Sequence, residues 1–193
     1  MTEDIKNNLS KKSLARFIAC QAICIYYDTN NSDKNLNDIL ENINEYFVKI
    51  DFDNTKYCNI YKSKFVHDLV NGVIKNQEEY DILINKLLNK QDTTETIDEI
   101  ILATFRAAIY EFENSTLDKN IIINEYVDIV GEFYNNVYTG FANGILENLA
   151  VEIREKKTKE IKKEEPKMEV KKENNDKIII KTKKKRKVIS LKK

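Results

Sequence analysis

Residues 97–112 read IDEIILATFRAAIYEF and point to a helical protein. Their apolar positions recur at intervals of three and four, which places them on one wide stripe of a helix. The stripe comprises Ile97, Ile100, Ile101, Thr104, Phe105, Ala108, Ile109 and Phe112. Because so wide a stripe needs neighbours on several sides, we predict that this helix lies at the centre of a bundle.

Six further segments have the same spacing of apolar residues and are predicted to be helices. They comprise residues 14–25, 36–47, 65–73, 80–88, 123–133 and 141–153. The chain has only one Pro and four Gly in 193 residues, whereas sheets joined by tight turns use far more of both. The fold class is therefore predicted to be all-α, with seven helices.

Charge divides the chain into two parts, although the formal net charge is zero. Residues 1–153 hold 14 basic and 25 acidic residues, a net of −11, and residues 154–193 hold 18 and 7, a net of +11. We predict a helical domain over 1–153 and a low-complexity, Lys-rich, disordered tail over 154–193. This tail either binds an anionic partner such as nucleic acid or is solvated and folds back on the acidic domain.

The N-terminal region has neither a secretory signal nor a membrane span. No stretch there combines basic residues with an uninterrupted apolar segment, and the most apolar run, residues 17–27, is broken by Gln21. We therefore expect a cytoplasmic protein that does not associate with a membrane.

Three cysteines, Cys20, Cys24 and Cys58, lie on periodic segments and lack the paired spacing of a zinc site. Cys20 and Cys24 are one helical turn apart, but His67 is the only imidazole in the chain. We predict reduced cysteines that pack in the core, with no metal site.

Motifs for catalysis are also missing from the sequence. Phosphate-binding loops need closely spaced glycines, and the nearest approach, Gly140 with Gly144, lacks the Lys-Ser/Thr pair of a P-loop. No nucleophile elbow accompanies any cysteine. The chain is predicted to be no enzyme and to need no cofactor.

Basic residues gather at the opening turns of the first predicted helix. Lys11, Lys12 and Arg16 lie there, where positive charge opposes the helix dipole. This placement suggests a phosphate-bearing partner, and a solvated helix start is the alternative.

Two other features of the sequence lead to predictions from the chemistry of the residues alone. Arg106 and Glu125 are candidates for a partly buried structural ion pair between two helices. Phe141 opens the last predicted helix, where an aromatic ring either stacks on a base or fills the core.

Five blocks of the sequence together resemble the NusB family of transcription antitermination factors. The first, ARFIACQAI at residues 15–23, is similar to the family pattern A-R-x-x-A-x-Q-A-L. The second, FVHDLVNGV at residues 65–73, is similar to the family's third helix. The others are RAAIYEF at 106–112, INE at 123–125 and FANGIL at 141–146, similar to the patterns R-x-A-x-Y-E-L, I-N-E-A and F-V-N-G-V-L. The blocks occur in the family's order.

This resemblance implies an all-α fold of seven helices in two subdomains. It also implies a transcription antitermination factor that binds the boxA element of ribosomal RNA leaders together with NusE, a small-subunit ribosomal protein. Members of the family act in the RNA polymerase antitermination complex by binding, without catalysis.

The resemblance further implies which residues bind RNA. Lys11, Lys12, Arg16 and Gln21 match the family's basic RNA-binding opening. Phe141 matches an aromatic residue implicated in RNA contact.

The sequence departs from the family pattern on the predicted functional surface. Ser13 and Leu14 replace two arginines of the usual cluster, which predicts fewer phosphate contacts and weaker RNA binding by the domain. Other departures are predicted to face the ribosomal-protein partner and to make that contact more apolar, or to permit self-association through the same patch. They are Ile101, Leu102, Val137 and Tyr138.

Two alternative functions belong to other classes. A protein-only interaction module that has lost specific RNA binding fits the thinned arginine cluster and the negative domain. An RNA-methyltransferase module contains a similar domain, but no glycine-rich cofactor loop follows residue 153.

Overall fold

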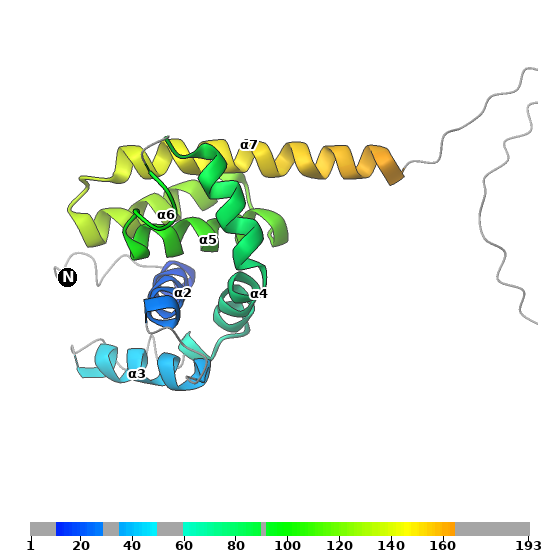
Figure 1. The fold of residues 1–193 in the computed structure, drawn as a ribbon. Coiled ribbons are helices and arrows are strands. Elements are labelled where there is room, and N and C mark those ends of the chain that lie inside the picture. Colours follow the sequence, from blue (N-terminus) through cyan, green and yellow to red (C-terminus); the bar gives the residue numbers. More distant parts are fainter. Residues whose placement is uncertain (1–10, 29–34, 50–59, 90–91, 165–193) are drawn as a thin grey trace, which may run out of the picture. The chain divides into compact units, whose positions relative to one another are not determined.

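A computed structural model describes residues 11–28, 35–49, 60–89 and 92–164, and these residues form helices and no strand (Figure 1). The predicted all-α class is therefore confirmed for the described part of the chain. The elements are α2 (Lys11–Asp28), α3 (Leu36–Lys49), the 3-10 helix η1 (Ile60–Lys62), α4 (Lys64–Leu87), α5 (Glu99–Asn114), α6 (Lys119–Tyr134) and α7 (Thr139–Glu164).

Helix α5 is central, as its wide apolar stripe predicts. Every residue from Ile100 to Ile109 is buried, which means that α5 has neighbours on all sides over three turns. It packs against α2, α4 and α6 (Figure 1). The ring of Phe105 lies 6.0 Å from that of Phe141 on α7. The first three turns of α5 are therefore the core around which the other helices pack.

The two helices predicted over 65–73 and 80–88 lie in α4 as two segments that meet at a kink. Asn76 separates them, because its backbone is non-helical (φ −113°, ψ 17°). The Asn76 amide donates to the Gly72 carbonyl at 2.8 Å, and the linking residues contain no Pro that would end the helix outright. With α4 taken as one element the described residues hold six α-helices, and its kink falls between the two segments that were predicted separately.

The buried apolar residues of α2 to α7 form one continuous cluster. The two subdomains that the resemblance implies therefore share their core. The chain divides into two units, residues 1–153 and 154–193, and the cluster belongs to the first. The predicted disordered tail is helical at its start, because α7 continues to Glu164, and residues 165–193 of that tail lie outside the described residues. None of the described helices is long and apolar enough to cross a bilayer.

The turn between α6 and α7 depends on two asparagines. Asn135 (φ 48°) and Asn136 (φ 64°) both adopt the left-handed region, which Asn tolerates better than most residues. Both backbone amides donate to the carbonyl of Gly131. The chain therefore reverses sharply before α7 and leaves Val137 and Tyr138 on the outside of the turn.

Gly72 permits the close approach of α4 and α5. A Cβ atom built on Gly72 collides with the ring of Tyr110 on α5. Gly144 on α7 has nothing within 4 Å of the equivalent position. The two glycines are thus a matched pair, one at a helix contact and one in open space.

We expect Gly72→Ala to lower the free energy of unfolding by about 1–2 kcal/mol, because Tyr110 must move out of its site. Gly144→Ala should raise it by up to about 1 kcal/mol, through helix propensity alone. Urea denaturation followed by circular dichroism measures both, and equal effects of the two substitutions would contradict this packing.

Candidate nucleic-acid interface

The start of α2 exposes two positive charges. Lys11 and Lys12 are exposed, and the first turn of the helix contains no acidic residue. Neither lysine has an ion-pair partner among the residues that the structure describes. The helix dipole adds partial positive charge at the same place. An anion at this helix start therefore meets two lysines and the positive end of the helix dipole.

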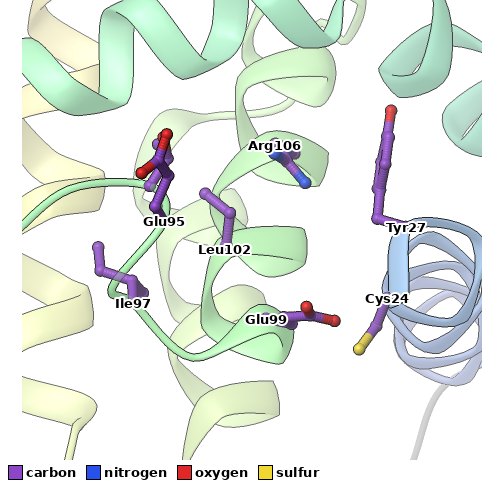
Figure 2. A pocket seen from close by; sticks show the side chains of 8 residues that line it. Cys24, Tyr27, Glu95, Ile97, Glu99, Leu102 and Arg106 are labelled. Carbon is purple, nitrogen blue, oxygen red and sulfur yellow. The ribbon is translucent and has the colours of Figure 1, made fainter. Parts of the chain in front are cut away.

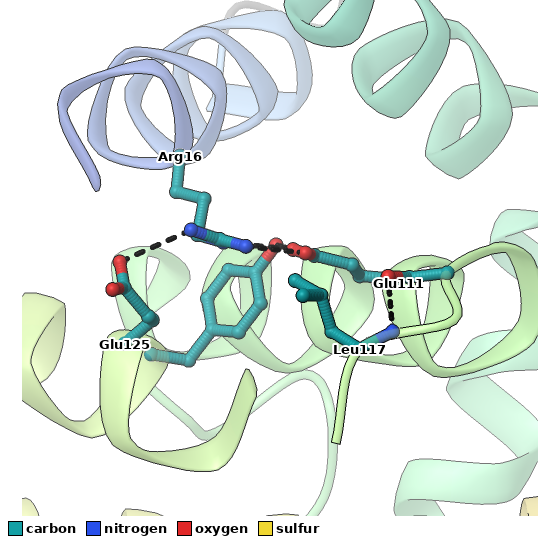
Figure 3. A network of polar contacts seen from close by, with 6 residues as sticks. Arg16, Glu111, Leu117 and Glu125 are labelled. Carbon is teal, nitrogen blue, oxygen red and sulfur yellow. Dashed lines mark hydrogen bonds and ion pairs between the residues drawn. The ribbon is translucent and has the colours of Figure 1, made fainter. Parts of the chain in front are cut away.

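Arg16 lies one turn further along α2 and points into the protein (Figure 3). Its Nε donates to Oε2 of Glu111 at 2.8 Å, and its Nη2 donates to Oε1 at 2.5 Å. Its Nη1 donates to Oε2 of Glu125 at 3.1 Å. The Tyr126 hydroxyl donates to Glu111 at 3.0 Å, and the guanidinium carbon lies 5.6 Å from the ring centre of Phe65. One arginine thus joins α2 to α4, α5 and α6.

Two members of the network, Arg16 and Tyr126, have a raised pKa. Burial lowers the pKa of Arg16, but the hydrogen bond and the charge of Glu111 outweigh it, and the pKa is raised overall. Burial, followed by the charge of Glu111, raises the pKa of Tyr126 well above its usual range. At physiological pH the guanidinium therefore stays charged and the phenol stays a donor.

The structure corrects the expectation that Arg16 contacts phosphate. Arg16 is only 2% exposed, and two carboxylates already hold its guanidinium. Because α2 packs across α5 and α6, the side chain on this face of the helix enters the core. Arg16 therefore supports the site, and its charge is not offered to a ligand.

The predicted ion pair between Arg106 and Glu125 is wrong. Arg106 instead makes a bidentate pair with Asp81 on α4, with both N···O distances 2.8 Å, and Glu125 belongs to Arg16. The guanidinium carbon of Arg106 also lies 4.6 Å from the ring centre of Tyr27. Asp81 can pair with Arg106 because α4 packs directly against α5.

Gln21 and Phe141 are both half-buried. The Oε1 atom of Gln21 is buried and has no hydrogen-bond partner in the described part of the chain. Phe141 packs with Phe105 of α5, so its ring contributes to the core as well as to the surface. No described contact links Phe141 to the start of α2. Core packing of this ring is therefore confirmed, and base stacking stays a prediction.

The four predicted partner-facing residues separate into two groups. Ile101 (3% exposed) and Leu102 (5% exposed) are buried within the core around α5, so their assignment to a partner surface is wrong. Apolar residues occupy these positions because α5 is enclosed by its own chain. Val137 (74% exposed) and Tyr138 (45% exposed) are instead open to solvent. Tyr138 packs edge-on against Tyr134, so the turn presents a small apolar surface.

The match to known proteins settles the family. A model described as the NusB family matches residues 13–151. This chain belongs to the NusB family. The transcription antitermination protein NusB of Nitrobacter hamburgensis is 28% identical over 156 residues, covering 78% of this chain and 95% of that protein. The transcription antitermination protein NusB of Rhodopseudomonas palustris strain BisB18 is 29% identical over 146 residues, covering 75% of this chain and 84% of that protein.

Solved structures confirm the NusB fold. The solution structure of NusB from Aquifex aeolicus superposes with a TM-score of 0.61 at 18% identity, over 84% of this chain and 100% of that chain. The structure of T. maritima NusB superposes with a TM-score of 0.59 at 22% identity, over 79% of this chain and 99% of that chain. A chain in a crystal structure of the antitermination factors NusB and NusE in complex with dsRNA superposes with a TM-score of 0.57 at 19% identity. The match covers 72% of this chain and 96% of that chain.

The structure shows what two residues in the NusB-like blocks of the sequence do. Glu111, in the block similar to R-x-A-x-Y-E-L, and Glu125, in the INE block, are the two carboxylates that bind Arg16. Sequence reasoning missed Glu111 and also Asp81, the partner of Arg106. A signal for Glu111 existed, because this acidic residue lies between Ile109 and Phe112, the last two members of the apolar stripe, and a carboxylate buried there needs a cation.

Both described cysteines, Cys20 and Cys24, have a raised pKa. Burial raises the pKa of Cys20 to about 12. Burial, with the nearby charge of Glu99, raises the pKa of Cys24 to about 11. Among the described residues no group of three potential ligands could hold a metal ion. Cys58 lies outside the described residues.

We expect Glu111→Ala to lower the free energy of unfolding by about 3–5 kcal/mol, because it leaves the Arg16 guanidinium buried without its bidentate partner. The double variant Arg16→Met with Glu111→Leu should cost less than this single change, since it buries no charge. Glu78→Gln, at an exposed position of α4, is the control. Urea unfolding of the four proteins tests this, and a double variant less stable than Glu111→Ala would contradict it.

In a Cys58→Ser variant, alkylation by iodoacetamide at pH 8 should be slow. Raising the pKa of Cys24 from 9.0 to about 11 leaves roughly 100-fold less thiolate than an ordinary cysteine has. Mass spectrometry measures the rate, and the same variant unfolded in urea provides the reference. Equal rates in the folded and unfolded proteins would show that these thiols are not buried.

Proposed function

We propose that this NusB-family protein is a transcription antitermination factor that binds boxA-type RNA of ribosomal RNA leaders together with NusE. It acts within the RNA polymerase antitermination complex by binding and catalyses no reaction. The observation that carries the proposal is the buried Arg16 network, which fixes α2 against three other helices and holds its lysine-bearing start at the surface. A solved structure of similar fold contains NusB with NusE and dsRNA, which supports the choice of partners.

In this proposal, some residues contact the phosphates of the RNA and others contact its bases. Lys11 and Lys12 supply charge at the positive end of α2, and phosphate contacts of this kind set the register of the RNA. Gln21 and Phe141 would contact unstacked bases, through an amide and through an aromatic face. Arg16 takes no part in these contacts, because it is buried.

The surface proposed for NusE is the turn between α6 and α7. Val137 and Tyr138 are exposed there, next to Tyr134. Removing exposed apolar side chains of this kind from water is favourable, so they suit a contact with another protein. A second copy of the chain would compete for the same residues.

A second candidate function is a protein-only interaction module. The burial of Arg16 favours it, because the described opening of α2 then presents only two lysines. The net charge of −11 over residues 1–153 also opposes RNA. The tail supplies the opposite charge, with nine basic and no acidic residues from 177 to 193, and we propose that it adds phosphate contacts that are independent of RNA sequence.

The experiment is binding of a boxA RNA and a scrambled RNA across a salt series, with and without NusE. Lys11→Ala with Lys12→Ala should weaken binding of boxA RNA and reduce the salt slope by about 1.5–2, because two phosphate contacts are lost. Lys75→Ala with Lys119→Ala, which removes two exposed lysines elsewhere, should leave both unchanged.

A variant of the full chain with residues 183–187 changed to Gln separates the tail from the domain. The proposal predicts that this variant still prefers boxA RNA and that NusE strengthens its binding. If both RNAs bind equally and their binding disappears with the tail charges, the protein-only module is the better description of residues 1–153.

A further inference from the structure

Two phenylalanine rings on different helices form a parallel stack at the surface. The ring centres of Phe17 on α2 and Phe133 on α6 lie 5.1 Å apart, and the ring planes differ by only 8°. Phe133 is 37% exposed, whereas Phe17 is half-buried against the core. Because Phe17 covers one face of the Phe133 ring, the opposite face and the edge are what remains for a ligand. The stack therefore supports one flat aromatic surface.

Polar side chains flank this stack along α2. Ser13 lies one turn before Phe17 and Gln21 lies one turn after it, and both are half-buried. The core of a protein–protein contact usually has further apolar side chains around such a ring. A nucleobase has apolar faces and polar edges, so it suits a flat ring between polar side chains better than an aliphatic side chain does.

The charge along α2 favours a phosphate strand near Phe17. Lys12 is exposed and lies five residues before Phe17, about 8 Å along the helix axis. Towards the other end of the helix, Cys24 lines a cavity opposite Glu99 of α5, and Glu95 lines the same cavity (Figure 2). These carboxylates repel phosphate. An RNA strand is therefore expected to lie over the first half of α2, beside Phe17.

The neighbours of Phe133 on α6 point away from its ring. Glu132 lies about 100° round the helix from Phe133 and Asp128 about 140°, both on the same side. Tyr134 lies about 100° away on the opposite side and packs on Tyr138 of the turn. The ring thus has the carboxylates on one side and the proposed NusE surface on the other, so an RNA base and NusE would occupy different sides of α6.

Phe141, the aromatic residue that the family resemblance implies, has a different environment. Its ring is tilted by 57° against that of Phe105, which is fully buried, so Phe141 packs into the core. Phe133 lies outside the core cluster and is stacked in parallel on its neighbour. Phe133 is also the more exposed of the two residues. Its ring therefore offers a base more surface, in an orientation that is fixed before the RNA binds.

We propose that Phe133, supported by Phe17, stacks on an unpaired base of single-stranded RNA. Phe17 acts as a positioning residue, since it holds the ring of Phe133 in place. The inference rests on the proposed function, because it needs an RNA ligand, and it adds a base-binding residue that lies outside the five NusB-like blocks. A base within a duplex is covered on both faces by its neighbours, so this site selects single strands.

The test measures the affinity of the full chain, with NusE present, for a fluorescent boxA RNA across a salt series. Phe133→Leu should weaken binding about tenfold at every salt concentration without changing the salt slope, because it removes a stacked base and no phosphate contact. Phe133→Tyr, which keeps a ring, should bind within about twofold of the unmodified chain. Ile121→Ala, at an exposed position of the same helix, is the matched control, with no effect expected. Binding of NusE without RNA should be unchanged in every variant, and circular dichroism confirms that each is folded.

Abasic RNAs identify the stacked base. One RNA is made for each position of boxA, lacking the base at that position alone. At one position Phe133→Leu and the unmodified chain should bind equally, since the stacking partner is already absent. Pairing the RNA to its complement should also remove the difference between the two proteins.

Four results would overturn the proposal. They are unchanged RNA binding by Phe133→Leu, an equal loss in Phe133→Tyr, a loss that traces to weaker binding of NusE, and a tenfold difference that persists with every abasic RNA or in the duplex. If the unmodified chain prefers boxA RNA and Phe133→Leu binds it equally well, this inference fails and the proposed function stands. If the unmodified chain binds no RNA, both fail.

Discussion

The fold depends on one buried cation, the guanidinium of Arg16. It is held by Glu111 and Glu125 and packs against Phe65, so a single side chain from α2 contacts α4, α5 and α6. Apolar packing alone lets helices slide, whereas a bidentate ion pair has one geometry. Leaving any member of the network unpaired is costly, so the network specifies one arrangement of these helices. The exposed residues of α2 take their positions from this arrangement.

A similar solution occurs at the other end of α2. Arg106 of α5 pairs with Asp81 of α4 and lies against Tyr27, so the interhelical contact again combines a charge with an aromatic ring. Both arginines are then withdrawn from the surface. Each arginine neutralises at least one carboxylate, namely Glu111 and Glu125 for Arg16 and Asp81 for Arg106, so neither contributes its charge to a surface site.

Apolar periodicity predicted much of the fold, because it records which face of each helix is buried. The central position of residues 97–112 and the all-α class follow from that record alone. It failed where the answer depends on partners distant in sequence. Ile101 and Leu102 were assigned to a partner surface because they depart from the family pattern, although α5 is enclosed on all sides there. Arg16 and Glu125 were singled out but Glu111 was not, and 95 and 109 residues separate Arg16 from Glu111 and Glu125, which spacing cannot pair.

The charge balance of the candidate site follows from these pairings. A basic helix start can bind phosphate only through charges that the fold has not already used, and in α2 those are Lys11 and Lys12, since Arg16 is neutralised inside. Two lysines on a domain of net charge −11 give a weak electrostatic footprint. On the proposed function, selectivity for RNA would then come from base contacts and from a second protein that binds at the same time. Phosphate contacts add affinity for any sequence, so a domain with few of them gains specificity by depending on its partner.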